Sequence, residues 1–410
     1  MIDKLVRIIS SLSEPSDYDE KDHTWLSPLN LKLNSTSEIQ LAQLIDRFMD
    51  ESKKKTKEPH LSSLRRHWEL ILLNLSRAVF QRRWLLVGLD NRAFAEGTPY
   101  SRNGWSHGPT KRVIEHLEQQ GLIHKHKGKK YNNPKRTRVF PTKDLAPLLY
   151  QFFLDTEQPI KPPYTTINDP SDPWLDARNA GPSASDWEEE ELAKINDFLR
   201  GHSWACKGPV NLLYKTDPFS GGRLYTAYQN LPDRRARVRI NTLIDGEAIA
   251  EVDFSANHLR LQLAVMHQQD AGDTPYEDIG TASGIIDRDI IKAFITRAMG
   301  ADNRDAAQNS CKTEGITNVM FESLEAACAE LYPELQLFIG WTHQGQNLEG
   351  QILKKVMLKG VDEGVVCLPV HDAIAVQRRH ESWAVKTMIS TWTDVVGCDV
   401  QPRVKVDKAA

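Results

Sequence analysis

Two aspartates, each in a recognisable sequence frame, constrain this chain more than any other feature. Asp253 ends an apolar strand pattern in EVDFSANHLRLQLA, and Asp372 lies in VVCLPVHDAIAV, where a His-Asp turn separates two short apolar runs. A carboxylate at a strand end and another at a hairpin tip can together hold two divalent cations. Polymerases and many nucleases use two cations about 3.5–4 Å apart to stabilise an in-line phosphoryl displacement. The pair therefore predicts a metal-dependent phosphoryl-transfer site, and we interpret it as that of a nucleic acid polymerase.

The length and composition set the broad class. A chain of 410 residues predicts two or three domains. No apolar run approaches the roughly 18 residues that cross a bilayer, and the N-terminus lacks a signal-peptide core. We therefore expect no membrane partner. The five cysteines are scattered and odd in number, which favours buried free thiols in a reducing cytoplasm over a zinc site or a disulfide framework.

Positive charge is concentrated in one part of the chain. Residues 61–150 carry 17 Lys and Arg against 6 Asp and Glu, a balance of +11, whereas the remainder carries 35 against 49, a balance of −14. A basic block inside an otherwise acidic chain indicates a module that binds a polyanion.

The basic block predicts three helices followed by a hairpin. A long apolar-periodic segment begins near Leu64, and SHGPTKRVIEHLEQQGLI carries helix signals at Ser106, Pro109 and Gly121. The hairpin HKHKGKKYNNPKRTRVFPT follows directly and carries seven Lys or Arg and no acid between residues 124 and 138. This order resembles a winged helix-turn-helix domain, in which one helix enters the major groove and the wing contacts the DNA backbone.

The alternative for the hairpin is a solvated, charged loop on a structural helical domain. Mutual repulsion among unopposed cations favours the DNA-binding interpretation, and the wing would add salt-sensitive, largely sequence-independent affinity. The candidate DNA-binding residues of this region are Lys111, Arg112, Lys125, Lys127, Lys129, Lys130, Lys135, Arg136 and Arg138.

We expect four segments along the chain. Residues 1–60 form an N-terminal helical arm to which no chemistry is assigned, and residues 61–150 form the winged-helix-like domain. Residues 151–186 form a linker, because residues 155–186 contain six prolines and little periodicity. Residues 187–410 form the domain that contains both aspartates.

Five segments between about residues 221 and 376 occur in a fixed order: GGRLYTAYQNLPDRRARVRI, EVDFSANHLRL, DRDIIKAFITRAMG, QNLEGQILKKVM and LPVHDAIAV. In this order they resemble the motifs of the family A DNA polymerases and, more distantly, the phage-type single-subunit RNA polymerases. The resemblance covers under half of the chain. It implies an α+β fold in which a polymerase palm with an antiparallel sheet and reduced fingers follows the winged-helix-like domain.

The resemblance also implies catalytic roles. Asp253 and Asp372 would be metal ligands, together with the backbone carbonyl of Phe254. Arg288 and Lys292 lie one turn apart on a helix, so they would face the same way. They would bind the triphosphate of an incoming nucleotide, and Lys292 would protonate the leaving pyrophosphate.

The implied binding residues and partners extend this set. Candidate nucleotide-binding residues are Phe254, His258, Arg288, Lys292 and Thr296, and candidate primer-template contacts are Arg223, Gln229, Asn230, Arg260, Gln346 and His371. The expected cofactor is a pair of Mg²⁺ ions, with Mn²⁺ as the alternative. The expected partners are a DNA template and primer, dNTPs or rNTPs, and as a further candidate a helicase or another replication protein.

The first segment also carries an alternating arginine cluster, Arg234, Arg235, Arg237 and Arg239. This pattern is typical both of a strand that lines a groove for a nucleic acid backbone and of an ordinary exposed strand face. The two interpretations remain open.

The chain departs from the family pattern at several positions. His258 replaces the glutamate that crowds the sugar 2′ position in the DNA polymerases, so sugar selection is not carried over. Gly300 stands at the place of the nucleotide-stacking tyrosine, and Thr296 replaces the usual aromatic residue. Residues 187–220 are too few for the family's thumb, and an exonuclease domain does not fit.

Three functions are consistent with these patterns. The first is a small template-directed polymerase, such as a primase-polymerase that acts in the replication of a bacterial or mobile genetic element. The second is a DNA-binding initiator or regulator with a structural palm, and the third is a template-independent nucleotidyltransferase or a nuclease. The presence of both aspartates and both helix cations favours the first over the second. Arg223 and Gln346 favour it over the third.

Overall fold

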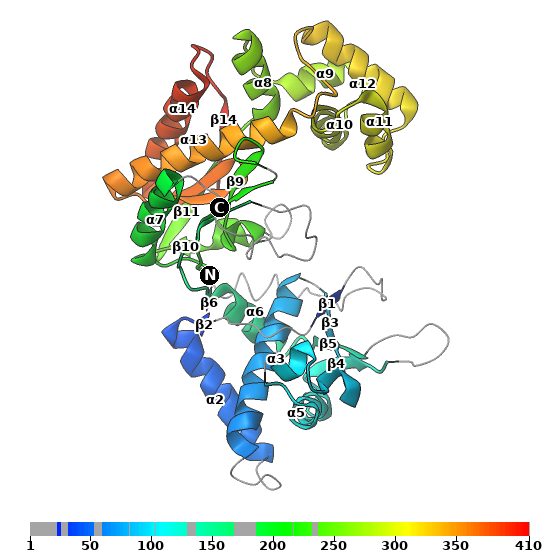
Figure 1. Ribbon diagram of the computed structural model, residues 1–410, viewed down its shortest axis with the longest axis vertical. Helices are drawn as coiled ribbons and strands as arrows, with labels where there is room; N and C mark the ends of the chain where they lie inside the picture. The colour runs from blue at the N-terminus through cyan, green and yellow to red at the C-terminus, as the bar shows by residue number, and fades with distance from the viewer. Residues whose placement is uncertain are drawn as a thin grey trace. The chain divides into compact units, whose positions relative to one another are not determined.

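The computed structural model describes residues 23–25, 32–52, 60–81, 83–102, 104–128, 137–167, 186–215, 217–231 and 237–409. They form a mixed α+β structure with several antiparallel sheets (Figure 1). The chain divides into two compact units: unit 1 is Met1–Pro159 with Ala205–Lys207, and unit 2 is Ile160–Trp204 with Gly208–Ala410. Within the described ranges, no helix combines the length and apolarity needed to cross a membrane.

Three helices form the core of unit 1: α2 (Ser35–Ser52), α3 (Leu61–Gln81) and α6 (Ala146–Leu154). The amphipathic α3 joins the other two through aromatic contacts. Trp68 of α3 stacks on Phe48 of α2 with ring centroids 5.0 Å apart, and Phe80 stacks on Phe153 of α6 at 4.0 Å. Burial of such large rings is the main source of stability in a small helical core.

Unit 1 also contains a four-stranded sheet. After α3 the chain forms β3 (Trp84–Val87), η3 (Asn91–Phe94), α4 (Pro99–Arg102), α5 (His107–Gln119), β4 (Ile123–His126) and β5 (Thr137–Pro141). The strand order is β1-β3-β5-β4, in which β1 (His23–Trp25) runs parallel to β3 and the other pairs are antiparallel. A separate two-stranded ladder joins β2 (Lys32–Leu33) to β6 (Thr156–Glu157).

The long apolar segment that begins near Leu64 is therefore not a single helix. It forms α3 and then β3, whose four residues are all buried. A continuous apolar run has no period of its own and does not distinguish a helix from a fully buried strand. The expected linker also contains regular structure, since it overlaps the end of α6, all of β6, and β7 (Thr165–Ile167) of unit 2. Residues 168–185 of that linker lie outside the described residues.

The main sheet of unit 2 is antiparallel and is built around β11 (Glu247–Phe254). One edge of β11 pairs with β13 (Ala373–Gln377), which pairs with β12 (Leu368–Val370), and the other edge pairs with β14 (Val404–Lys408). The short β10 (Leu243–Ile244) pairs with the start of β11. Ile249, Ala250 and Val252 of the central strand are fully buried.

A second sheet in unit 2 contains β7, β8 (Asn211–Tyr214) and β9 (Gly221–Tyr225), with β7 parallel and β9 antiparallel to β8. The helices around the two sheets are α7 (Asp186–Arg200), α8 (Asn257–His267), α13 (Thr342–Glu363) and α14 (Glu381–Val396). A separate group of four helices, yellow-green to yellow in Figure 1, comprises α9 (Pro275–Ser283), α10 (Arg288–Gly300), α11 (Arg304–Lys312) and α12 (Asn318–Leu331). Three short 3₁₀ helices lie in other connections: η5 (Tyr228–Asn230), η6 (Arg239–Asn241) and η7 (Arg378–His380).

Two glycines bring α13 into close contact with β9. A Cβ atom added at Gly350 would lie 1.8 Å from the carbonyl oxygen of Gly222, which is itself in the left-handed region with a φ of 78°. A side chain at position 350 would therefore collide with backbone that cannot easily move. This contact fixes the depth at which α13 meets the second sheet.

We expect Gly350→Ala to lower the free energy of unfolding by about 1–3 kcal/mol or more, because overpacking against backbone costs this much. The clash would outweigh the gain of roughly 1 kcal/mol that alanine normally brings to a helix interior. Urea unfolding followed by circular dichroism measures the change. Gly201→Ala is the matched control, since its nearest neighbour, the carbonyl oxygen of Phe198, would be at an ordinary 3.6 Å. Equal stability of the two variants would contradict the prediction.

Candidate active site

The structure brings the two predicted aspartates to the same end of two neighbouring strands. Asp253 is the penultimate residue of β11, and its partner across the ladder is Ala373, which follows Asp372 in sequence. The backbone N–H of Phe254 lies 3.5 Å from the carbonyl oxygen of Asp372. His371 adopts a left-handed conformation (φ 57°) in the turn between β12 and β13. The hairpin therefore places Asp372 beside the end of the central strand.

The chain turns sharply directly after Asp253. Ala256 adopts a left-handed conformation (φ 51°), and α8 begins at the next residue. The chain thus leaves the sheet directly after β11, and Asp253 at this end is only partly covered.

Burial and neighbouring carboxylates raise the pKa of both aspartates. Burial, followed by the charge of Glu251, raises the pKa of Asp253 to about 6. Burial, followed by the charges of Glu349 and Asp253, raises the pKa of Asp372 well above its usual value. When carboxyl groups lie close together, ionisation of one makes ionisation of the next less favourable, because like charges repel. The arrangement is therefore short of positive charge, and a bound cation would supply it.

Two lysines and one arginine partly offset this repulsion. Lys292 of α10 and Lys405 of β14 both act to lower the pKa of Asp253, and Lys405 is its ladder partner. Arg223 of β9 acts to lower the pKa of Asp372. Lys292 is exposed at the surface, so its ammonium group remains accessible to a ligand.

The candidate residues of α10 follow one exposed face of the helix. Arg288, Lys292 and Thr296 are spaced four residues apart and are all exposed. The guanidinium of Arg288 pairs with Glu277 at 3.2 Å and lies 5.2 Å from the centre of the Tyr276 ring. The hydroxyl of Thr296 donates a hydrogen bond of 2.8 Å to the carbonyl of Lys292. Both cations are therefore placed for exchange with an anionic ligand.

Glu349 of α13, which the sequence did not single out, connects several candidate residues. Its side chain is 1% exposed. One oxygen accepts a hydrogen bond of 2.7 Å from Arg223, and the other lies 2.9 Å from Nε2 of His258 and 3.1 Å from the Asn257 amide nitrogen. Burial alone would raise the pKa of Glu349, but His258 and Arg223 lower it to about 2. The only sequence signal is its register on the buried face of α13, between Gly345 and Leu353.

Tyr276 of α9 is a second residue that the sequence did not indicate. Its side chain is buried, and burial followed by the charge of Asp372 raises its pKa to about 12. Because the Asp372 charge acts on it and Arg288 lies over its ring, the tyrosine belongs to the same neighbourhood. Nothing in the segment TPYED distinguishes this tyrosine from an ordinary core residue.

Among the predicted primer-template contacts, Arg260 lies deepest. It is 1% exposed, and its guanidinium donates to the carbonyls of Ser255 and Asp273 at 2.8 and 3.2 Å, with Asp270 at 3.4 Å. These contacts connect the turn after β11 to the loop that precedes α9. By contrast, Gln346 is partly exposed on α13. His371 is exposed in the β12–β13 turn, and partial desolvation of its ring, followed by the charge of Arg223, lowers its pKa.

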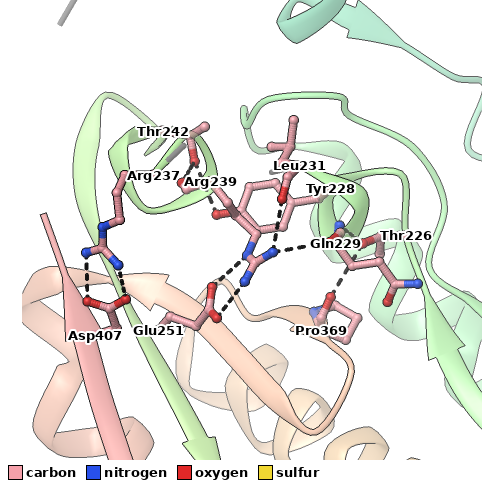
Figure 2. Close-up of polar contacts among 10 residues, drawn as sticks. All are labelled: Thr226, Tyr228, Gln229, Leu231, Arg237, Arg239, Thr242, Glu251, Pro369 and Asp407. Carbon is pink, nitrogen blue, oxygen red and sulfur yellow. Dashed lines mark hydrogen bonds and ion pairs between the residues drawn. The ribbon is translucent and has the colours of Figure 1, made fainter. Parts of the chain in front are cut away.

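Gln229 and Asn230 lie in η5, which Arg239 fixes to the central strand (Figure 2). The guanidinium of Arg239 donates to both oxygens of Glu251 at 2.7 and 2.8 Å and to the carbonyls of Gln229 and Leu231 at 3.3 and 3.1 Å. Gln229 is buried, and Asn230 is exposed.

The arginine cluster does not form the expected strand where it is described. Arg239 begins the 3₁₀ helix η6, and Arg237 pairs with Asp407 of β14 (Figure 2). Both arginines therefore bind carboxylates of their own unit. Arg234 and Arg235 lie outside the described residues.

The basic candidates of unit 1 differ in exposure. Lys111, Arg112 and Lys127 are exposed, whereas Lys125 is 14% exposed and pairs with Glu118. Arg138 is 8% exposed, and its guanidinium lies 5.4 Å from the centre of the Trp84 ring. The remaining candidates, Lys129, Lys130, Lys135 and Arg136, lie outside the described residues.

The donor set fits hard divalent cations. In the described part of the chain, no group of three or more His, Cys, Asp or Glu side chains is arranged to hold a metal ion. The nearby Glu349 is not a free ligand, because one of its oxygens binds Arg223 and the other binds His258. The oxygens of Asp253 and Asp372 remain, and Mg²⁺ typically binds proteins through one or two carboxylates and completes its octahedron with water and substrate phosphates.

Comparisons with known proteins find similar chains among solved structures alone. No protein-family model matches the chain, and no curated protein matches it. A solved structure described as the POL domain of Pol1 from M. smegmatis, in complex with DNA primer-template and dNTP, is similar with a TM-score of 0.33 and 12% sequence identity. The match covers 92% of this chain and 66% of that chain, so the chain spans about two thirds of the length of that domain. At this level of similarity, no residue role is transferred.

We expect Asp253→Asn to stabilise the protein at pH 8 without divalent cations. The folded pKa of about 6 lies above the usual 3.8, so folding favours the protonated form and stability falls as the pH rises from about 4 to 6. The variant removes this loss, worth up to about 3 kcal/mol at pH 8, and should match the original protein near pH 4. Urea unfolding in a chelator at the two pH values measures the difference.

Asp407→Asn is the control of opposite sign. Arg237 lowers the pKa of Asp407, so this carboxylate contributes stability above its unfolded pKa that is lost in acid. Its removal should lower stability at pH 8. If Asp253→Asn also destabilises at pH 8, the interpretation of Asp253 as an electrostatically strained carboxylate is wrong.

Proposed function

We propose that this protein is a template-directed nucleic acid polymerase that uses two Mg²⁺ ions, with Mn²⁺ as the alternative, and acts as a small primase-polymerase in the replication of a bacterial or mobile genetic element. One observation carries this proposal: two partly buried aspartates lie side by side, Asp253 at the end of β11 and Asp372 in the turn between β12 and β13. Their mutual repulsion is what a two-cation site needs before the cations bind.

Different residues around this pair would bind the ions, neutralise phosphate charge and donate a proton. Asp253 and Asp372 would hold the two ions, with the backbone carbonyl of Phe254 as a further donor. Bound Mg²⁺ would supply the Lewis acidity that phosphoryl transfer requires. Lys292 would neutralise charge on the triphosphate and donate the proton that the leaving pyrophosphate takes up, because its ammonium group is exposed and its charge acts on Asp253.

Two arginines would supply further positive charge: Arg288 on the exposed face of α10 that carries Lys292, and Arg223 on β9, whose charge acts on Asp372. Arg288 would exchange the exposed Glu277 for a phosphate, since an exposed ion pair is worth little. Arg223 is held by the buried Glu349 and would stay in place while it contacts the primer-template. The expected partners are thus a DNA template and primer with dNTPs or rNTPs, and a helicase or another replication protein remains a candidate.

Unit 1 supports DNA binding through the order of its elements. Helix α3, strand β3, helices α4 and α5, and the β4–β5 hairpin follow one another, and β3 pairs with β5. From this helix–strand–helix–helix–hairpin order we infer a winged-helix-like DNA-binding domain. Helix α5, which would enter the major groove, buries one face formed by Thr110, Val113, Ile114 and Leu117. Lys111 and Arg112 lie on its exposed face.

Primer extension in Mg²⁺ tests the polymerase proposal. We expect template-dependent synthesis that Asp253→Asn or Asp372→Asn abolishes. Lys292→Ala should slow synthesis by roughly 100-fold or more, because general acid catalysis contributes on this scale. Lys312→Ala, which removes an exposed lysine of α11, is the matched control and should keep full activity.

The other outcomes of this assay identify different functions. Product on a bare single strand without a template would indicate a template-independent nucleotidyltransferase. No incorporation under any condition, with DNA binding intact, would indicate an initiator or regulator. Full activity in the aspartate variants would refute the site itself.

Salt dependence tests the DNA-binding role of unit 1. The logarithm of the affinity for duplex DNA should fall linearly with the logarithm of the salt concentration, and each phosphate contact contributes about 0.9 to the slope. We therefore expect Lys111→Ala and Lys127→Ala each to reduce the slope by about 1. Lys143→Ala is the control, since Lys143 is exposed in the turn after β5 at the base of the hairpin. Unchanged slopes in both test variants would contradict the proposal.

A further inference from the structure

An aromatic side chain projects from the connection between β8 and β9 in unit 2. Phe219 is 80% exposed. Its sequence neighbours Asp217 and Ser220 are polar, and the exposed Lys215 precedes them. A phenylalanine in such a polar turn is not explained by core packing. Of the exposed large hydrophobic side chains described for unit 2, only Tyr225 shares this hairpin; the others are Val265, Met266, Ile286, Val319 and Ile339.

Hydrogen bonds restrain the described backbone on both sides of Phe219. The Phe219 N–H donates to the Asp217 carboxylate at 2.8 Å, and the Lys215 N–H donates to the carbonyl of Ser220 at 2.8 Å. The amide nitrogen of Asn347 on α13 donates to the carbonyl of Pro218 at 3.0 Å. Because the backbone is already held, little more than the side-chain torsions of Phe219 must be ordered when the ring binds a partner.

Positive and aromatic groups lie along the same hairpin. Lys215 is exposed, with its Nζ 3.4 Å from Nε2 of His343 on α13. Arg223 and Tyr225 are two residues apart on β9, so their side chains point to the same face of the strand. Tyr225 is 36% exposed. We call Lys215, Phe219, Arg223, Tyr225 and His343 the β8–β9 surface.

The β8–β9 surface continues to the candidate active site through Arg223. This arginine pairs with Glu349, and its charge acts on Asp372. The acid nearest to Phe219 in sequence, Asp217, is itself bound within the turn. A polyanion could therefore extend from the aspartates along β9 toward Phe219 and meet cations on the way.

We propose that the β8–β9 surface binds single-stranded nucleic acid, with Phe219 stacking on an unpaired base. Exposed aromatic rings beside cations are how proteins hold single strands without sequence preference, since each base presents a π-face. In a duplex, most base faces are already covered by their neighbours. A protein partner fits less well, because the core of a protein interface needs a contiguous apolar patch. The inference rests on the proposed function for the presence of nucleic acid, and it adds the strand type and the residue.

Equilibrium binding of a fluorescent single-stranded oligonucleotide to the full chain tests the proposal, without Mg²⁺ or nucleotides. We expect Phe219→Ala to weaken binding of the single strand about tenfold, because stacking on one base is worth about 1–3 kcal/mol. Phe219→Trp should retain or improve binding, and affinity for a blunt duplex should not change. Val319→Ala is the matched control, as Val319 is 73% exposed on α12. Affinities equal to those of the control, or an equal loss on the duplex, would overturn the proposal.

Photocrosslinking locates the contact directly, even when unit 1 contributes most of the affinity. A single strand that contains 5-iodouracil should crosslink at Phe219, and mass spectrometry of the peptides would identify the residue. Crosslinks found only within residues 61–150 would overturn the proposal. The result is separable from the polymerase proposal: a Phe219 crosslink without any synthesis would support this surface alone, and synthesis with no Phe219 effect would support the polymerase alone.

Discussion

The repulsion between Asp253 and Asp372 is the physical constraint around which unit 2 is arranged. Two carboxylates at the ends of adjacent strands would not stay ionised in a half-buried place without nearby positive charge. Lys292 and Lys405 act on the first aspartate, and Arg223 acts on the second. These cations come from a helix and two strands that are distant in sequence. The site therefore forms only when the main sheet, the second sheet and the group of four helices are all in place.

A third acid would make the repulsion worse if it were not neutralised. Glu349 is buried and raises the pKa of Asp372, yet its own pKa is low because Arg223 and His258 bind its oxygens. Removing one partner of a buried ion pair costs far more than the pair contributes, so this cluster ties α13, β9 and α8 to one relative position. The glycines that join α13 to β9, Gly350 and Gly222, are the sequence neighbours of Glu349 and Arg223, so the close backbone contact lies next to this ion pair.

Local patterns in the sequence predicted local structure. The apolar strand pattern before Asp253 and the apolar runs around Asp372 predicted a strand end and a hairpin, and both form. The residues that the sequence missed owe their roles to tertiary contacts. Glu349 became important through partners on two other elements, and Tyr276 through its position beside Asp372. Likewise, Arg138 belongs to a basic run, but its burial over Trp84 depends on how β5 pairs with β3.

Burial separates the arginines and lysines of unit 2 into two classes that sequence alone does not distinguish. Arg239 and Arg260 satisfy carboxylates and carbonyls of their own unit, with little exposure, and such groups give up their partners only at a large cost. Lys292 and Arg288 are exposed on α10, where an ion pair contributes at most about 1 kcal/mol and is readily exchanged. A strong, multiply charged ligand would therefore compete successfully only for the second class. Since that class lies on the helix whose Lys292 acts on Asp253, the nucleotide triphosphate of the proposed reaction would bind where the aspartates lack positive charge.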